Sequence, residues 1–273
     1  MKFAICNETF VDWPFDRAFA TAREIGYTGI EIAPFTIAHD AKEISPARRA
    51  EVRRQAEAAE LEVVGLHWLL AKTEGYYLTS PDAEVQQRTA EYLRELARLC
   101  RDLGGSIMVL GSPQQRNLLP GVSHDEAMRH AAGVLQAAMP ECEACGVTIA
   151  VEPLGPAEGD FLLTAESGIE LAKMVGSPNC RLHLDVKAMS SESKPIPEII
   201  RDSRDWVAHF HANDPNKLGP GMGEVAFAPI FQALQQINYP GWVSVEVFDY
   251  SPGPENIAQQ SLRYMQTMLE RLG

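Results

Sequence analysis

Four side chains of the kinds that bind divalent cations occur in the second half of the 273-residue chain, each at or near the end of a short apolar run. They are Glu152, Asp185, His211 and Glu246, which are 33, 26 and 35 residues apart. An acid buried in such a run needs a partner, because burying an unpaired charge is costly. Carboxylates brought together at one place would repel one another unless a cation lay among them. We therefore expect these four residues to bind a metal ion.

The ligand types indicate which ion this would be. Mostly oxygen ligands with one nitrogen suit a single divalent ion, for which we expect Mn²⁺, with Mg²⁺, Co²⁺ or Zn²⁺ as alternatives. Such an ion would keep positions open for two substrate oxygens. Taken singly, each residue could instead be a solvated charge at a strand end, but the similar position of all four in their runs favours the metal site.

The segments that must position these residues alternate between two kinds. Eight apolar, strand-like runs cover residues 2–6, 29–34, 62–69, 106–112, 147–153, 181–186, 206–214 and 241–248, and helical stretches separate them. Strands that alternate with helices predict a parallel sheet with crossover connections. A doubly wound open sheet is the main rival, but the turn "CNETFVDWPFD" after the first run lacks its Gly-rich fingerprint. We predict an α/β fold, a (β/α)8 TIM barrel, as a single domain over residues 1–273.

The barrel prediction places the four residues at one rim, because enzymes of this fold carry their chemistry at the C-terminal ends of the strands. Residues two positions earlier share the same face of each strand. They include His183 and His209, which we expect to form a deeper layer that either supports the metal site or contacts substrate. The residues in between should point outward to the helices, and all are apolar: Val151, Leu184, Phe210 and Val245.

Composition narrows the class of protein. A net charge of −13 disfavours nucleic acid as a partner, because phosphates attract basic surfaces. No apolar run reaches about 18 residues, so we expect no membrane span. The five cysteines are scattered and the N-terminal run lacks the features of a signal peptide, which together predict reduced thiols in a cytoplasmic protein. The lone pair Cys142 and Cys145 fits helix packing better than a zinc site.

Several stretches resemble the xylose isomerase-like barrel superfamily, and more narrowly its sugar phosphate isomerase/epimerase branch near the ketose 3-epimerases and hydroxypyruvate isomerase. They are "GYTGIEIAP", "VVGLHWL", "AVEPLGPAEGDFL", "LHLDVKAMS", "HFHANDPNKLGPGMGEVAF" and "GWVSVEVF". The resemblance covers almost the whole chain. It implies that the metal ligands are Glu152, Asp185, His211 and Glu246, that Glu158 is a substrate-contacting acid, and that His67 is the family's strand-three histidine.

The chain departs from the ketose epimerases at two substrate-binding positions. Ala188 stands where these enzymes have a histidine three residues after the strand-six aspartate, and Lys217 occupies a loop where they have an arginine. Lys187 and Lys217 are the basic residues near the predicted mouth, so each is a candidate for binding a phosphate or carboxylate, with a plain surface lysine as the alternative. These changes leave the metal site intact but leave the substrate open.

The resemblance also implies proton transfer next to a carbonyl. A divalent ion would stabilise the resulting enediolate as a Lewis acid, while one carboxylate removes the proton and another returns it. We assign that pair to Glu152 and Glu246, in an isomerase or epimerase of a sugar or sugar derivative. The main alternative is a dehydratase or lyase that acts on a keto-sugar or keto-inositol by the same proton abstraction.

Three further expectations concern partners and other functions. The substrate should be a small sugar-like molecule, and family resemblance predicts a homo-oligomer, either a dimer or a tetramer. A metal-dependent nuclease is disfavoured by the acidic charge, and a non-catalytic carbohydrate-binding barrel is disfavoured by the complete ligand set. The long loop over residues 71–82 is a candidate lid over the site.

Overall fold

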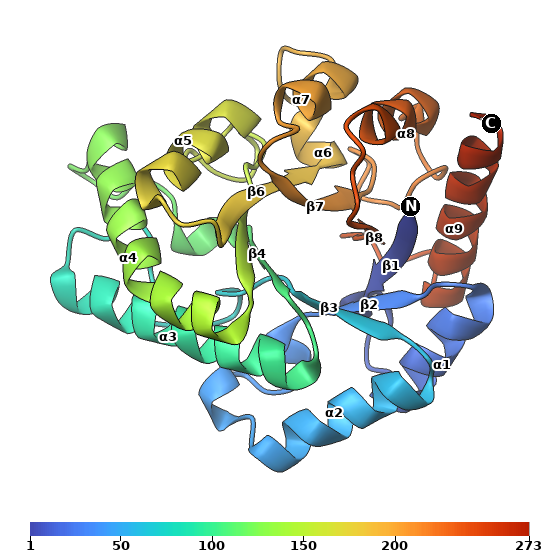
Figure 1. The fold of residues 1–273 in the computed structure, drawn as a ribbon, viewed down its shortest axis with the longest axis horizontal. Coiled ribbons are helices and arrows are strands. Elements are labelled where there is room, and N and C mark those ends of the chain that lie inside the picture. Colours follow the sequence, from blue (N-terminus) through green and yellow to red (C-terminus); the bar gives the residue numbers. More distant parts are fainter. Residues whose placement is uncertain (273) are drawn as a thin grey trace.

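The eight predicted strands all form and close on one another. The structure, a computed structural model, describes residues 1–272. All strands are parallel and follow chain order around a closed barrel (Figure 1). They are β1 (Lys2–Cys6), β2 (Gly29–Ile32), β3 (Glu62–Leu66), β4 (Ile107–Leu110), β5 (Thr148–Val151), β6 (Cys180–Asp185), β7 (Val207–Ala212) and β8 (Trp242–Val245). Because β8 pairs with β1, the (β/α)8 barrel is confirmed and the open sheet is excluded.

Helices surround the barrel on its outside (Figure 1). The longer ones are α1 (Phe15–Ile25), α2 (Pro46–Ala58), α3 (Ala83–Leu103), α4 (His124–Cys145), α5 (Ala165–Val175), α7 (Ile196–Asp202), α8 (Phe227–Gln236) and α9 (Pro254–Glu270). One short helix, α6 (Val186–Met189), begins directly at the end of β6, and four 3-10 turns occupy η1 (Asn7–Thr9), η2 (Pro34–Thr36), η3 (Ala41–Glu43) and η4 (Pro113–Gln115). Helix α6 and turns η1, η2 and η4 follow strand ends, so they help to build the rim.

Local sequence signals explain where the helices start and stop. The Ser123 hydroxyl accepts from the backbone of Glu126, and the Glu126 side chain accepts from the backbone of Ser123, which completes a capping box at the start of α4. The Asp82 carboxylate accepts the first free N–H groups of α3, and Gly104 ends that helix in the left-handed region with a φ of 94°. These signals mark the start of the two longest helices and the end of α3.

The aliphatic core lies between the strands and the helices. Val151, Leu184, Phe210 and Val245 point outward from their strands, and each is at most 1% exposed. Burying side chains of this size contributes roughly 1.5–3 kcal/mol each. The inside of the barrel differs, because several polar side chains there are completely buried. The outward layer can supply most of the hydrophobic stabilisation, so the interior is available for polar groups that hold one another.

Two further predictions concern the cysteines and a possible membrane span. All five cysteines are free, and Cys142 and Cys145 both lie on α4. Among the helices of residues 1–272, none combines the length and the apolar character needed to cross a bilayer.

Candidate metal centre and active site

Strand register brings the two predicted layers of β6 and β7 together. Asp185 pairs with His211 and His183 pairs with His209. On the neighbouring strand β5, residues lie at a different height along the barrel axis, because strands in a barrel are staggered. Val151 pairs with Leu182, so the next residue, Glu152, comes level with His183 rather than with Asp185.

A buried group of four potential ligands results. One ligand atom from each of Glu152, His183, Asp185 and His211 lies within 4.8 Å of the other three. This group contains three of the four residues that the sequence predicts as ligands, together with His183 from the deeper layer. The fourth predicted ligand, Glu246, adjoins it, with its Oε2 atom 3.1 Å from Nδ1 of His211. The buried cluster can therefore hold a metal ion, and His183 is an additional candidate ligand.

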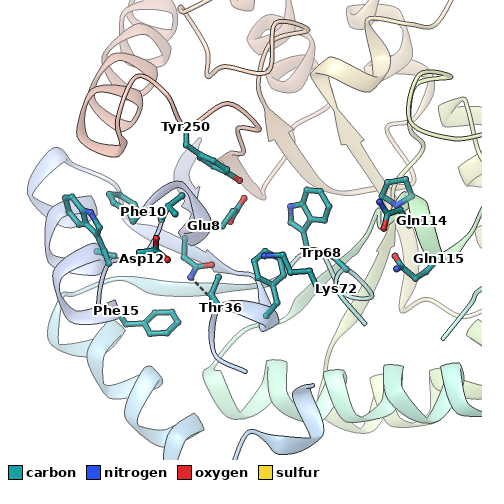
Figure 2. A pocket seen from close by; sticks show the side chains of 17 residues that line it. Glu8, Phe10, Asp12, Phe15, Thr36, Trp68, Lys72, Gln114, Gln115 and Tyr250 are labelled. Carbon is teal, nitrogen blue, oxygen red and sulfur yellow. Dashed lines mark hydrogen bonds between the residues drawn. The ribbon is translucent and has the colours of Figure 1, made fainter. Parts of the chain in front are cut away.

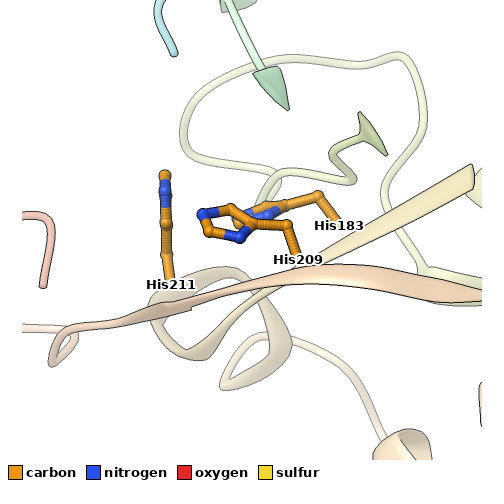
Figure 3. Close-up of side chains that lie close together, drawn as sticks. All are labelled: His183, His209 and His211. Carbon is orange, nitrogen blue, oxygen red and sulfur yellow. The ribbon is translucent and has the colours of Figure 1, made fainter. Parts of the chain in front are cut away.

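His183 lacks the hydrogen bonds that a buried imidazole requires. It is fully buried, yet neither ring nitrogen has a hydrogen-bond partner among the described residues. Its Nε2 atom lies 3.8 Å from Oε1 of Glu152, and its ring stands across that of His211, 4.2 Å away (Figure 3). Burial and the neighbouring His211 hold the pKa of His183 well below its usual range, so the ring is neutral. A neutral, unpaired imidazole beside carboxylates is the form that binds a metal, and a cation here would satisfy it.

The carboxylates of the cluster repel one another. Burial and the charge of Glu246 raise the pKa of Asp185 to about 6. Burial, Glu246 and Asp185 raise the pKa of Glu152 well above its usual range. Burial acts on Glu246 in the same direction, but the neighbouring His211 outweighs it and lowers the pKa of Glu246. A cation would relieve this repulsion, so the electrostatics fit the metal that the sequence predicts.

Sequence reasoning missed Glu31, which orients His209 and His211 from β2, on the other side of these rings from the carboxylate cluster. It is fully buried on β2 and accepts hydrogen bonds from Nε2 of His209 at 2.8 Å and from Nε2 of His211 at 3.1 Å. Burial favours the neutral acid, but the two histidines outweigh it and hold the pKa of Glu31 well below its usual range. With Nε2 engaged, His211 presents Nδ1 to Glu246 and the cluster, as metal-binding histidines usually do. An acid inside the apolar run "GIEIAP" was the available signal, the same one that singles out Asp185.

The position of Glu152 depends on the neighbouring β4 end. A Cβ atom on Gly111 would lie 1.5 Å from Oε2 of Glu152, so only glycine leaves room for this carboxylate in its observed position. The buried guanidinium of Arg116 donates to the backbone carbonyl oxygens of Glu152 at 2.6 Å and of Leu110 at 3.2 Å. Arg116 was not predicted from sequence, because a lone arginine in a loop carries no pattern.

The predicted His67 faces the site and pairs with a residue that the sequence did not suggest. Its Nε2 atom lies 2.6 Å from Oε2 of Glu8, which is on η1. Burial would lower the pKa of His67, but Cys6 and Glu8 raise it well above its usual range. One ligand atom from each of Glu8, His67 and Glu246 also lies within 4.8 Å of the other two. His67 therefore forms a buried ion pair beside the cluster.

The two predicted lysines lie in different surroundings. Nζ of Lys187 is 2.5 Å from Oε2 of Glu158, and both residues line the small cavity over Glu152, Asp185 and Glu246. Burial would lower the pKa of Lys187, but Asp185 and Glu158 raise it. By contrast, Lys217 is exposed and is not among the residues that line this cavity.

Two cavities meet at this rim. The small one, of about 20 Å³, lies over the carboxylates, whereas a second of about 760 Å³ extends along η1, η2 and η4 (Figure 2). Trp68 and Pro113 line both. The loop over residues 71–82 contributes Ala71 and Lys72 to the large cavity, and its action as a lid stays a prediction.

Fold and site together define a (β/α)8 barrel with a buried cluster of carboxylates and imidazoles at the C-terminal rim. The model of the family described as xylose isomerase-like TIM barrel matches residues 19–268, and the chain belongs to this family. The resemblance predicted from the motifs is thereby confirmed.

Named relatives narrow the group. The chain is 30% identical to an L-ribulose 3-epimerase of Mesorhizobium japonicum over 67% of its own length and 62% of the relative. It is 26% identical to a probable ketose 3-epimerase of Synechocystis over 90% of its length and 88% of the relative. A D-psicose 3-epimerase structure from Clostridium cellulolyticum superposes with a TM-score of 0.87 at 20% identity, covering 98% of this chain and 99% of that one. The expected kinship with sugar isomerases and epimerases is thus confirmed.

Proposed function

We propose that the protein is a divalent-metal-dependent epimerase or isomerase of a keto-sugar. The observation that carries the proposal is the buried group Glu152, His183, Asp185 and His211, whose carboxylates repel one another and whose His183 has no partner among residues 1–272. The named relatives are epimerases of ketoses, which supports the same reaction class. The reaction would exchange a proton on the carbon next to a carbonyl.

The chain supplies two carboxyl groups with opposite pKa shifts for this transfer. Glu246 is ionised, because His211 lowers its pKa, and it accepts the proton from the substrate carbon. The electron pair of the broken C–H bond moves toward the neighbouring carbonyl. Glu152, whose pKa is raised, would bind the metal through one carboxylate oxygen and return a proton to carbon from the other. Carboxyl groups with separated pKa values mark an acid and a base, and delivery from opposite faces of the substrate inverts the carbon.

The metal would be held by Asp185, His211, Glu152 and Glu246, with His183 as an additional or alternative ligand. A divalent ion bound there would polarise the substrate carbonyl as a Lewis acid. We propose Mn²⁺, because oxygen ligands with one or two imidazoles suit it, and Mg²⁺, Co²⁺ and Zn²⁺ are the alternatives. Glu31 keeps His211 oriented, with Nδ1 toward Glu246.

The substrate-binding residues differ from those implied by the ketose 3-epimerases. Lys187 and Glu158 face the cavity as an ion pair, with His67 nearby, and the methyl side chain of Ala188 cannot form a hydrogen bond. We propose that His67, Glu158 and Lys187 bind substrate hydroxyl groups, that His183 and His209 stay beneath it, and that Lys217 acts only if its loop moves. The departure at Ala188 keeps dehydratase or lyase chemistry as the second candidate.

Solvent exchange followed by NMR tests the proposal. Metal-loaded protein is incubated in D₂O with D-fructose, D-psicose or L-ribulose, and deuterium at C3 together with formation of the C3 epimer is the expected result. Glu246→Gln should abolish the exchange, whereas the exposed Glu255→Gln on α9 serves as a matched control. Loss of water from the sugar would indicate the lyase, and retention of all C–H protons across the panel would refute the proposed reaction on these ketoses.

We further propose a cytoplasmic homo-oligomer, a dimer or a tetramer, with no nucleic-acid or membrane partner. The acidic charge of −13 supports the absence of nucleic acid. Light scattering of the purified protein tests the oligomeric state.

A further inference from the structure

The large cavity beside the metal cluster has no role in the proposed proton transfer. It measures about 760 Å³, against about 20 Å³ for the cavity over the reacting carboxylates, and Trp68 and Pro113 connect the two. Small-molecule sites occupy roughly 300–1,000 Å³. The larger space therefore suits a part of the substrate that extends away from the reacting carbon.

The walls of this cavity are aromatic with polar ends. Figure 2 shows Gln114 and Gln115 toward one end and Asp12 and Phe15 toward the other, with Trp68 and Glu8 between them. The aromatic lining residues are Phe10, Trp13, Phe15, Phe35, Trp68 and Tyr250. Aromatic faces offer large apolar contact areas, while amide and hydroxyl groups hydrogen-bond neutral partners. A sugar ring has both kinds of surface, with apolar C–H faces and hydroxyl groups at its edge.

The charged side chains that line the cavity are Glu8, Asp12 and Lys72. Nζ of Lys72 lies 4.0 Å from the ring centre of Phe35, and the guanidinium of Arg17, which does not line the cavity, lies 3.5 Å from the ring centre of the lining residue Trp13. Glu8 is bonded to His67 at 2.6 Å. Asp12 remains, exposed at the rim. Glu8 thus has a cationic partner, and the single charges of Lys72 and Asp12 are opposite in sign, so the lining has no excess charge that would favour an anion or a cation.

Trp68 stands where the two cavities join, in an unusual conformation. Its φ is 54°, in the left-handed region that bulky residues rarely adopt, and such strain clusters at binding sites. Its buried indole Nε1 has no hydrogen-bond partner among the described residues. The ring also packs edge-on against Phe248, 6.1 Å away, in the wall of the small cavity. A ligand that spans both cavities would therefore pass against the ring of Trp68, which lines both of them.

We propose that the large cavity binds a second, neutral sugar ring linked to the reacting keto-sugar, so that the substrate is a keto-disaccharide rather than a free ketose. This inference rests on the proposed function for the position of the reacting ring. The second ring would lie between Trp68 and Trp13, with Gln114 and Gln115 available to its hydroxyl groups.

Calorimetric binding to metal-loaded protein tests the inference without relying on turnover. D-fructose is compared with isomaltulose and lactulose, which carry glucose on O6 and galactose on O4 and leave the carbonyl and C3 free. At least one disaccharide should bind about tenfold more tightly than fructose, and its C3 proton should exchange with a correspondingly higher kcat/KM. Equal or weaker binding of both disaccharides would overturn the inference, as would tighter binding of a charged fructosyl-amino acid.

Two variants locate the effect in the cavity. Trp13→Ala removes one wall and Ala71→Trp fills the space from the loop side, and each should lower the disaccharide-to-fructose affinity ratio about tenfold. Trp206→Ala is the matched control, because Trp206 is also half-buried with an arginine, Arg181, 5.3 Å from its ring but does not line the cavity. An unchanged ratio in both cavity variants, shown by melting curves to be folded, would refute the assignment.

Binding and exchange separate this inference from the proposed function. Exchange with fructose, without tighter disaccharide binding, refutes the extended substrate and leaves the epimerase intact. Tighter disaccharide binding without proton exchange supports the cavity assignment and refutes the reaction.

Discussion

Replacing Asp185 by asparagine should change how the stability of the metal-free protein depends on pH. Burial and the charge of Glu246 raise the pKa of Asp185 from its ordinary value of 3.8 to about 6. A shift of this size corresponds to about 3 kcal/mol of preference for the neutral acid in the folded state. Because the folded state binds the proton more tightly than the unfolded state, ionisation destabilises the fold as pH rises from 3.8 toward 6 and above.

The magnitude follows from the two pKa values. Between about pH 4 and about pH 8, the wild-type protein should lose about 2 kcal/mol of unfolding free energy relative to Asp185→Asn, which cannot ionise. The asparagine also disturbs the hydrogen bonds from the Ala188 amide at 2.8 Å and the Asn213 side chain at 2.5 Å. That loss is independent of pH. It therefore shifts the unfolding free energy of Asp185→Asn by a constant amount and does not change how the difference between the two proteins varies with pH.

Urea denaturation of metal-free protein at several pH values measures this difference. Exposed Asp202→Asn on α7 is the control and should follow the wild-type profile. Saturating Mn²⁺ at high pH should stabilise the wild-type protein by about 2.7 kcal/mol at a hundredfold excess over Kd, and should not stabilise Asp185→Asn. If the unfolding free energies of the wild-type protein and Asp185→Asn changed with pH in parallel, ionisation of Asp185 would not destabilise the metal-free protein, and the reasoning would be refuted.

Three other perturbations test separate parts of the site. Gly111→Ala should lower metal affinity by roughly 10–100-fold, measured by calorimetry, because its methyl group collides with a ligand carboxylate; unchanged affinity would contradict the close approach of Gly111 and Glu152. Glu31→Ala should lower unfolding free energy by about 3–5 kcal/mol in denaturant titrations, because it strips two buried imidazoles of their partner; a loss below about 1 kcal/mol would refute the ion-pair interpretation. Lys187→Met should raise KM about tenfold with little change in kcat, because it frees Glu158 without touching the reacting carboxylates; a fall in kcat alone would place Lys187 in the chemistry instead.

The barrel was predictable because its signal is repetitive. Eight alternations of an apolar run with a helix are compatible with few topologies. The outward face of the strands was recognisable from four apolar residues: Val151, Leu184, Phe210 and Val245. The same alternation identified the inward residues, among them Asp185 and His211, which the structure brings together in register. The local periodicity of the sequence was therefore sufficient to predict the fold and much of the candidate site.

The remaining parts of the site depend on stagger and on loop conformation, which periodicity does not encode. His183 joins the cluster because β5 is offset against β6, so that Glu152 reaches the deeper layer. Glu8 and Arg116 reach the site from turns after β1 and β4, and isolated residues in turns carry no pattern. Glu31 is the exception, because an acid inside an apolar run was visible and carries the same signal as Asp185.

These buried groups form one connected network rather than separate sites. Glu31 accepts from His209 and His211, and His211 in turn contacts Glu246, so a change in one charge alters the pKa of the others. The network is stable on the side of Glu31, where carboxylate and imidazoles alternate, and repulsive on the side of Glu152 and Asp185, where carboxylates face one another. A cation is attracted most strongly to the second side, because the Glu31 carboxylate already faces His211, whose pKa, against the effect of burial, Glu31 and Glu246 raise well above its usual range. The charge distribution of the network thus favours a metal ion beside Glu152 and Asp185, which line the small cavity, over one beside Glu31.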